Sequence, residues 1–259
     1  MNVSVIMPFL DSDEIVRRLI KYWGRLDLPD DVEFIIMDDG SRKPLRHPDF
    51  GLLDLVAKYK LNLEIHETNE FRPWTSSVAR NRGAEIARGR NLFMVDGDYI
   101  VSRDALEKAR KFTGDRLGCR REFGILTEDG VLSQDRRVLH DWGLAHSRMR
   151  ARGLRIPPHP NQYVMSKALF EEMGGYDEER VFSCEYPQRE DNDFRRRLRA
   201  MVTAGKAVMT DEDRPTLFMY PNGQFCGDVD FNPFGLFHKL SRKTDRNYWH
   251  AHMRYDKAE

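Results

Sequence analysis

Asn91-Leu92-Phe93-Met94-Val95-Asp96-Gly97-Asp98-Tyr99-Ile100 is the stretch around which the chain is organised. Its apolar first half has the length of a buried strand, and two carboxylates that bracket a glycine follow it. Alternate residues of an extended backbone point to one side, so Asp96 and Asp98 can aim at one point while Gly97 lets a bulky ligand approach. Two such oxygen ligands suit Mg²⁺ or Mn²⁺. Taken alone, the stretch favours a solvated turn, but its surroundings favour a site.

The composition is that of a soluble globular protein, with 259 residues, 40% of them hydrophobic and 32% charged. Lys plus Arg and Asp plus Glu balance at 42 each, which argues against a general nucleic-acid binder. Cys119, Cys184 and Cys226 are far apart and form no C-x-x-C pair, so we expect reduced thiols rather than a zinc site or a disulfide framework.

The N-terminus begins directly with an apolar strand pattern, so we expect no signal peptide. No apolar run approaches the ~20 residues that a membrane-spanning helix needs. We therefore expect a cytoplasmic protein, with membrane contact only at the periphery.

Strands and helices are predicted to alternate through the first half of the chain. The expected strands are 3–7, 32–37, 61–66 and 91–95, and the expected helices are 12–26, 51–59, 76–88 and 104–112. This order predicts an α/β fold with a mostly parallel central sheet and helices on both faces. Ligands of such sheets bind beyond the carboxyl ends of the strands, where Pro8, Asp38-Asp39 and Asp96-Asp98 lie.

The second half of the sequence is less regular. Residues 113–160 allow no assignment; beyond them we expect strands at 162–165 and 207–209 and helices at 167–173, 190–204 and 239–257. Gly174-Gly175 predicts the end of the 167–173 helix. We expect one catalytic domain over 1–215, with a nucleotide-binding half at about 1–112 and an acceptor half at about 113–215. An aromatic and basic extension, 216–259, would pack on it.

Six motifs, in this order and spacing, resemble those of family 2 glycosyltransferases with the GT-A fold. They are Val5-Ile6-Met7-Pro8, Asp38-Asp39-Gly40-Ser41, Ala79-Arg80-Asn81-Arg82-Gly83, Val95-Asp96-Gly97-Asp98, Phe170-Glu171-Glu172-Met173-Gly174-Gly175-Tyr176-Asp177-Glu178 and Glu190-Asp191. The resemblance implies a metal-dependent, inverting transfer of a sugar from a nucleotide sugar, usually a UDP-sugar, to an acceptor that the sequence does not identify.

The resemblance also implies roles for individual residues. The implied donor-binding residues are Pro8, Phe9, Asp38, Asp39, Arg80, Asp96 and Gly97; the implied metal ligands are Asp98, Asp96 and His238; the implied catalytic residues are Asp191 as general base and Glu190 beside it. The metal, Mn²⁺ or Mg²⁺, would offset charge on the leaving diphosphate, and a carboxylate would remove the acceptor hydroxyl's proton.

Blander interpretations stay open for some of these residues. Asp191 could simply stabilise the start of a helix, and His238 could be a helix-surface or aromatic-packed side chain. The usual position of a third metal ligand, a His soon after the base, is empty because no His occurs between Cys184 and Phe237.

Three other functions are possible. A sugar-phosphate nucleotidyltransferase would be expected to carry a Gly-rich loop after the first strand, where this chain has Pro8-Phe9-Leu10-Asp11. A non-catalytic nucleotide-sugar-binding module would have no chemical need for both Asp98 and Asp191. A glycosyltransferase acting on nucleic acid is disfavoured by the zero net charge.

Overall fold

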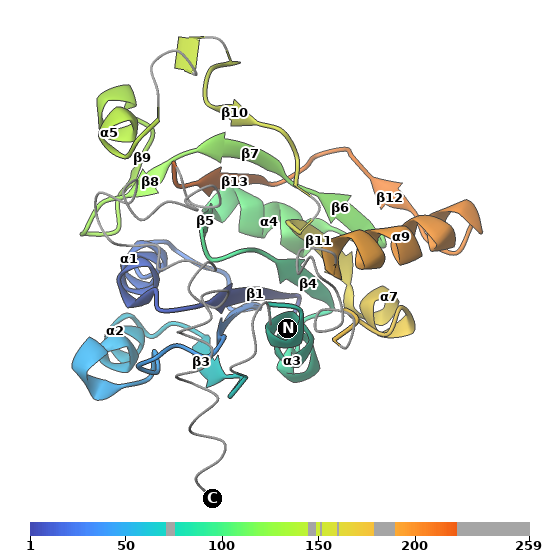
Figure 1. The fold of residues 1–259 in the computed structure, drawn as a ribbon, viewed down its shortest axis with the longest axis horizontal. Coiled ribbons are helices and arrows are strands. Elements are labelled where there is room, and N and C mark those ends of the chain that lie inside the picture. The colour runs from blue at the N-terminus through green and yellow to red at the C-terminus, as the bar shows by residue number, and fades with distance from the viewer. Residues whose placement is uncertain (71–75, 145–148, 151, 160, 179–189, 222–259) are drawn as a thin grey trace, which may run out of the picture.

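The computed structural model describes residues 1–70, 76–144, 149–150, 152–159, 161–178 and 190–221, without the side chains of Glu190 and Asp191. A seven-stranded sheet forms the centre of the molecule (Figure 1). Its strands, in spatial order, are β12 (Met209–Thr210), β6 (Arg116–Gly118), β11 (Tyr163–Ser166), β4 (Asn91–Met94), β1 (Val3–Phe9), β2 (Val32–Asp38) and β3 (Leu63–Glu67).

The half of this sheet built from β4, β1, β2 and β3 is entirely parallel, as the sequence predicts. β11 then joins β4 and β6 in antiparallel pairs, and β12 is parallel to β6. The fold is therefore the predicted α/β class, with a mostly parallel central sheet.

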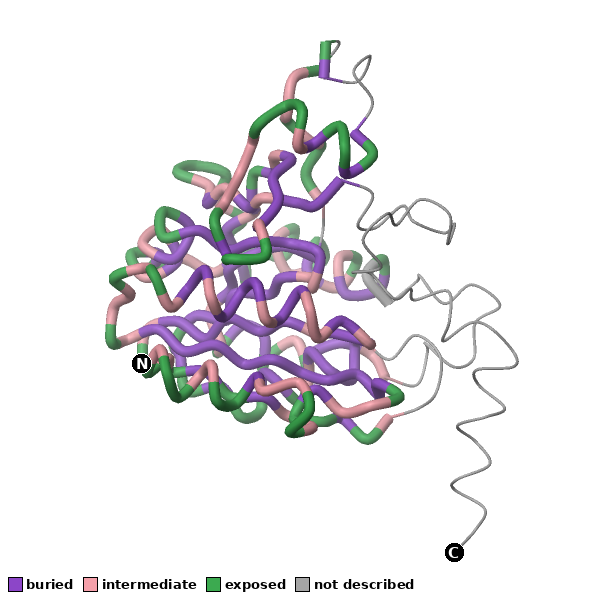
Figure 2. Tube along the Cα trace, turned by 90° about the vertical axis from the view of Figure 1, so that its left-hand side faces the viewer, coloured by how far each residue is buried: buried purple, intermediate pink, exposed green. Residues whose placement is uncertain are grey.

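Helices cover both faces of the sheet because successive strand residues point to opposite sides. In β1, Val5 and Met7 join one apolar cluster and Ile6 joins the other, and Figure 2 shows the buried strands in the interior. The first cluster includes side chains of α1 (Asp13–Trp23), α2 (Leu52–Tyr59), α4 (Arg103–Lys111) and α5 (Arg136–Asp141); the second includes those of α3 (Ser76–Ile86), α7 (Lys167–Glu172) and α9 (Glu190–Thr203). A short 3₁₀ helix, η1 (Pro48–Phe50), precedes α2.

A second, four-stranded sheet lies above the first in Figure 1. Its strands, in order, are β10 (Arg155–Ile156), β7 (Arg120–Phe123), β13 (Thr216–Met219) and β5 (Tyr99–Val101). A separate hairpin pairs β8 (Ile125–Leu126) with β9 (Leu132–Ser133). α4 packs against β1 and β4 of the main sheet and against β13 of the second.

The region that the sequence left unassigned, 113–160, supplies strands to all three sheets. β6 joins the main sheet, β7 and β10 join the second, and β8 and β9 form the hairpin. β13 begins at Thr216, where the expected C-terminal extension starts, so the first four residues of that extension are an inner strand. The predicted helix at 239–257 lies outside the described residues.

Two smaller expectations concern cysteines and membranes. Cys119 is a free, buried thiol, and burial raises its pKa, so it stays protonated; Cys184 and Cys226 lie outside the described residues. Within the described part of the chain, no helix combines the length and apolar character needed to cross a bilayer.

Candidate functional site

The polar ends of β1, β2 and β4 come together at one edge of the main sheet. The Asp39 N–H donates to the Phe9 carbonyl over 2.7 Å, which joins the segments leaving β1 and β2. Gly97 fits tightly against the same segment, because a Cβ there would lie 2.8 Å from the Phe9 ring and 2.9 Å from the Pro8 carbonyl oxygen. The glycine is thus required by close packing within the protein, a reason that differs from the ligand approach predicted from the sequence.

Asp38 shapes the loop that follows β2. One of its carboxylate oxygens accepts from the Ser41 N–H at 2.9 Å and the other from the Leu45 N–H at 2.8 Å. Burial raises its pKa, although the same hydrogen bonds partly oppose the rise. Both oxygens of Asp38 are therefore occupied by the backbone around Asp39, and Asp38 positions this loop.

Asp96 is held on both sides by side chains. One carboxylate oxygen accepts from the guanidinium of Arg80, a buried residue of α3, and the other from the side-chain amide of Gln162. The Arg80 guanidinium also lies over the Tyr176 ring, 5.4 Å from its centre. Asp96 keeps 17% of its side chain exposed, so it can still meet a ligand.

Asp98 is different, because its carboxylate is buried and neither oxygen has a hydrogen-bond partner among the residues that the structure describes. Burial raises its pKa well above the usual range, the negative charge of Asp96 raises it further, and Arg121 partly opposes both. A buried, unpaired carboxylate is costly in a folded protein. Such a cost is typical of a carboxylate at a functional site, for example one that binds a cation.

The second sheet supports Asp98 from the other side. The Tyr220 N–H, just after β13, donates to the Asp98 carbonyl at 3.1 Å, and Asp98 leads directly into β5. Arg121 of β7 donates to the hydroxyl of Tyr99 and to the carbonyl of Pro157, at 2.6 Å from Nε to the latter. Asp98 therefore sits where the two sheets meet.

The first turn of α9 contains the two residues expected to be catalytic, Glu190 and Asp191, whose side chains lie outside the described residues. The helix is fixed in place by Arg197, which donates to the carbonyls of Met173 and Gly175 at 2.6 and 2.7 Å. Gly174 and Gly175 both have positive φ and end α7, as predicted. An open pocket of about 460 Å³ lies at this joint, lined by Gly174, Asp177, Asp193, Arg196 and Arg197.

Asn81 connects the turn after α7 to α3, the helix that carries Arg80. Its side-chain oxygen accepts from the Tyr176 N–H at 2.8 Å, and its amide donates to the Tyr176 carbonyl and to Glu178 at 2.9 and 2.8 Å. Asn81 is the neighbour of Arg80 in α3, so the turn after α7 is tied both to Arg80 and, through Arg197, to α9.

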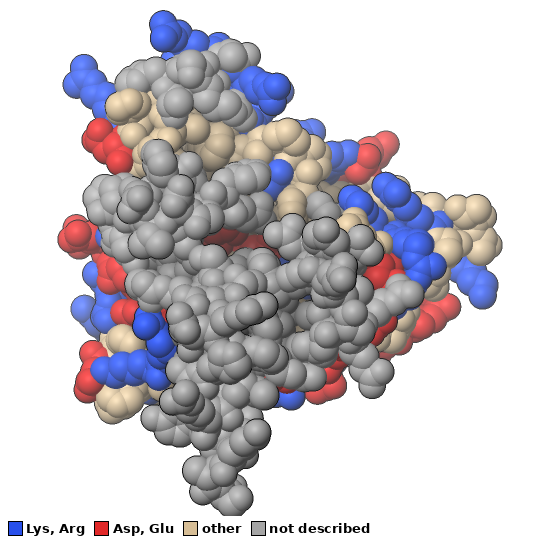
Figure 3. Space-filling model, viewed as in Figure 1, with Lys and Arg blue, Asp and Glu red and all other residues tan. Residues whose placement is uncertain are grey.

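The acidic residues of this edge offer a metal few ligands. Within the described ranges, no group of three or more His, Cys, Asp or Glu side chains is arranged to hold a metal ion. His238 lies outside the described residues. Figure 3 shows acidic side chains in a recess near the centre of the face drawn. Asp98, whose two oxygens have no hydrogen-bond partner within the described residues, fits Mg²⁺ or Mn²⁺, which complete their shells with water and substrate phosphates.

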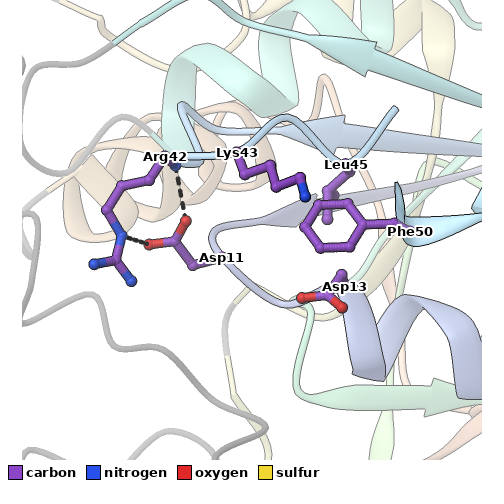
Figure 4. Close-up of a pocket in the computed structure, with 6 residues that line it drawn as sticks. All are labelled: Asp11, Asp13, Arg42, Lys43, Leu45 and Phe50. Carbon is purple, nitrogen blue, oxygen red and sulfur yellow. Dashed lines mark hydrogen bonds and ion pairs between the residues drawn. The ribbon is translucent and has the colours of Figure 1, made fainter. Parts of the chain in front are cut away.

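A shallow pocket of about 340 Å³ borders the same edge, beyond β1 and β2 (Figure 4). It is lined by Asp11, Asp13, Arg42, Lys43, Leu45 and Phe50. Asp11 closes one side by accepting from the Arg42 N–H at 2.8 Å. None of the residues predicted to bind the donor lines this pocket.

The structure thus brings together eight of the predicted site residues: Pro8, Phe9, Asp38, Asp39, Arg80, Asp96, Gly97 and Asp98. Sequence reasoning missed Gln162, Arg121 and Arg197. Gln162 is the first residue of an expected strand, and nothing in the sequence distinguishes these two arginines from the chain's many others. Only the contacts between distant segments reveal them.

Comparisons with known proteins agree with the fold. Residues 4–117 match the model of a family described as glycosyltransferase like family 2. No curated protein matches the sequence. Similar solved structures include TarS from S. aureus (18% identity, 86% of this chain, 37% of that chain, TM-score 0.54) and its residues 1–349 (19%, 87%, 62%, 0.54). The same residues of TarS in complex with UDP-GlcNAc are also similar (18%, 84%, 58%, 0.51).

These comparisons confirm the family resemblance and the GT-A fold that the motifs predicted. The family match lies in the half that carries β1, β2, β3, β4 and α3, and therefore the ends of the strands described above. The chain spans less than two thirds of the TarS chains that it matches.

Proposed function

We propose that this protein is a metal-dependent, inverting glycosyltransferase. It would move a sugar from a nucleotide sugar, of the UDP class, to a hydroxyl group of a saccharide, lipid or other acceptor. The observation that carries the proposal is Asp98, a buried carboxylate without a hydrogen-bond partner in the described part of the chain, at the edge of the sheet where open α/β folds bind their ligands.

Asp98 would be the protein's direct ligand to Mn²⁺ or Mg²⁺. A bound metal ion of this kind offsets the negative charge that builds on the diphosphate as it leaves. Asp96, already held by Arg80 and Gln162, would contact the ribose or the sugar rather than serve as a second ligand. That division leaves room around the cation for water and for phosphate oxygens.

Asp39, which follows β2 and lies beside Phe9 at the end of β1, would bind the base or the ribose. Its backbone is fixed by the bond to the Phe9 carbonyl and by the loop that Asp38 holds. Pro8 and Phe9 would form the wall of this nucleotide site, and Arg80 its positive charge. The UDP and UDP-GlcNAc complexes of the structurally similar TarS support the choice of a UDP donor.

Asp191 would act as the general base, with Glu190 beside it. Removal of the acceptor's proton by a positioned carboxylate typically contributes 10²–10⁴-fold to the rate. The first turn of α9 places both residues on the helix that Arg197 ties to the turn after α7. With Asp191 on the face opposite the leaving diphosphate, the acceptor oxygen would lose its proton to the base and bond to the anomeric carbon as the bond to the diphosphate breaks, which gives inversion.

The test is a thermal-shift titration with UDP, GDP and UDP-GlcNAc, each with and without Mn²⁺. A ligand that binds only the folded state raises the melting temperature by mass action. We expect a metal-dependent shift with the UDP ligands, and its loss in Asp98→Asn but not in Asp54→Asn, an exposed aspartate of α2. The absence of any shift in the folded wild type would refute the proposal.

A further inference from the structure

The side chain of Gln162, next to Asp96, carries a hydrogen-bond acceptor that no described residue uses. It lies immediately before β11, and its side chain is fully buried at 0% exposure. The amide nitrogen donates to one carboxylate oxygen of Asp96. The amide oxygen, in contrast, has no hydrogen-bond partner among the described residues.

The direction of the amide is fixed by its neighbour. An ionised carboxylate only accepts hydrogen bonds, so the NH₂ end of Gln162 must face Asp96 and the oxygen must face away from it. Exchanging the two ends would place the amide oxygen against the carboxylate and lose the bond. The orphaned oxygen is therefore a consequence of holding Asp96, and a buried acceptor of this kind needs a donor.

The groups around Gln162 limit which ligand group can donate a hydrogen bond to its amide oxygen. Arg80 donates to the other oxygen of Asp96. What remains on offer, from Asp96 and from Gln162, is acceptor capacity alone. A phosphate or a carbonyl of the ligand has no hydrogen to donate to either acceptor. A hydroxyl group donates one hydrogen bond, so a pair of neighbouring hydroxyls, as ribose and hexoses carry, can satisfy both.

We propose that Gln162 binds a hydroxyl group of the nucleotide sugar through its amide oxygen, beside Asp96. This inference rests on the proposed function and deepens it, because it makes Gln162 a residue that selects the donor. The hydroxyl belongs either to the ribose or to the transferred sugar. The chemistry is the same in both cases, and the experiment separates them.

The experiment measures affinities for UDP, 2′-deoxy-UDP, 3′-deoxy-UDP and UDP-GlcNAc, all with Mn²⁺, by calorimetry. The variant is Gln162→Met, which keeps the length and removes both the oxygen and the nitrogen of the side-chain amide. If the hydroxyl is on the ribose, the variant binds UDP and UDP-GlcNAc about tenfold more weakly than the wild type does. For the deoxy analogue that lacks this hydroxyl, the variant's affinity is no lower than its affinity for UDP. If it is on the sugar, only UDP-GlcNAc weakens.

The matched control is Gln134→Met, because Gln134 makes its hydrogen bonds to Glu122 and to the Phe123 carbonyl, at 3.2 and 3.0 Å. Should Gln162→Met fail to fold, Gln162→Asn keeps the amide but withdraws it by one methylene, and the same losses are expected. Unchanged affinities in a folded variant overturn this inference and leave the proposed function intact. A folded wild type that binds none of the four ligands overturns both.

Discussion

Arg197 of α9 donates a hydrogen bond of 2.7 Å from its guanidinium to the carbonyl oxygen of Gly175. A second bond of 2.6 Å reaches the carbonyl of Met173, and Asp193 accepts from Arg197 Nε at 2.8 Å. One side chain thereby fixes the helix that begins with Glu190 and Asp191 to the turn after α7. The distance between that helix and the rest of the site is set here.

Arg197→Lys should therefore lower kcat more than it weakens donor binding. Lysine keeps the charge but cannot form the forked pair of bonds, so the first turn of α9 loses its fixed position. Misplacement by about 1 Å can cost on the order of 100-fold in rate. Steady-state kinetics and UDP titration give the two quantities. Arg195→Lys is the control, since Arg195 lies on the same helix and, among the described residues, its hydrogen bond goes to Asn192 at 2.7 Å. Equal losses in both variants would contradict the interpretation.

Asp191→Asn should abolish transfer while nucleotide and metal binding persist. Asparagine has nearly the same shape but cannot take a proton, so only the base is removed. We expect a fall in kcat of about 10²–10⁴-fold with unchanged UDP affinity. Transfer at the wild-type rate would show that another group is the base.

Gly97→Ala should destabilise the protein by about 1–3 kcal/mol, because an added methyl group overpacks the space beside Phe9. Since Phe9 and Asp96 would both be displaced, UDP affinity should fall as well. Gly118→Ala is a matched control: among the described residues, its added Cβ would come within 4 Å of Asp211 alone, at 3.9 Å. Denaturant unfolding and UDP titration measure both effects. Equal stability of the two variants would argue against close packing at Gly97.

Glu33→Gln should lower the free energy of unfolding at neutral pH and make it less dependent on pH in the acid range. Burial alone would raise the pKa of Glu33, but hydrogen bonds from Ser4 and Arg88, each 2.6 Å long, outweigh it and lower the pKa. A lowered folded-state pKa gives stability that is present above the unfolded value of about 4.3 and lost as the pH falls through the folded value.

Urea unfolding from pH 7 to pH 3 tests this prediction. The wild type should be the more stable by about 1–3 kcal/mol at pH 7, and the difference should shrink below pH 4. Parallel stability curves for Glu33→Gln and the wild type would mean that Glu33 keeps an ordinary pKa in the folded protein.

The parallel half of the fold was predictable because its strands are buried on both faces. Runs such as Val3–Met7 and Val32–Met37 are almost wholly apolar, and such runs need no knowledge of their partners to be recognised. The same regularity placed Asp39, Asp96 and Asp98 at strand ends, and so at one edge of the sheet.

The second sheet was not predictable, since its strands are short and pair across long stretches of chain. β7 reads Arg120-Arg121-Glu122-Phe123, a charged sequence that looks exposed, yet Arg121 is buried. Its partner β13 lies almost a hundred residues later, at Thr216–Met219. Gln162 was missed for a related reason, because its role depends on Asp96, which belongs to a different strand end.

The position of β13 also limits how the protein can be shortened. β13 pairs with β7 on one side and with β5 on the other, and Tyr220 then bonds to the backbone of Asp98. A truncation before Thr216 would open two unpaired strand edges at once and favour aggregation. Any trimmed version meant for crystallisation or screening must therefore extend to Tyr220.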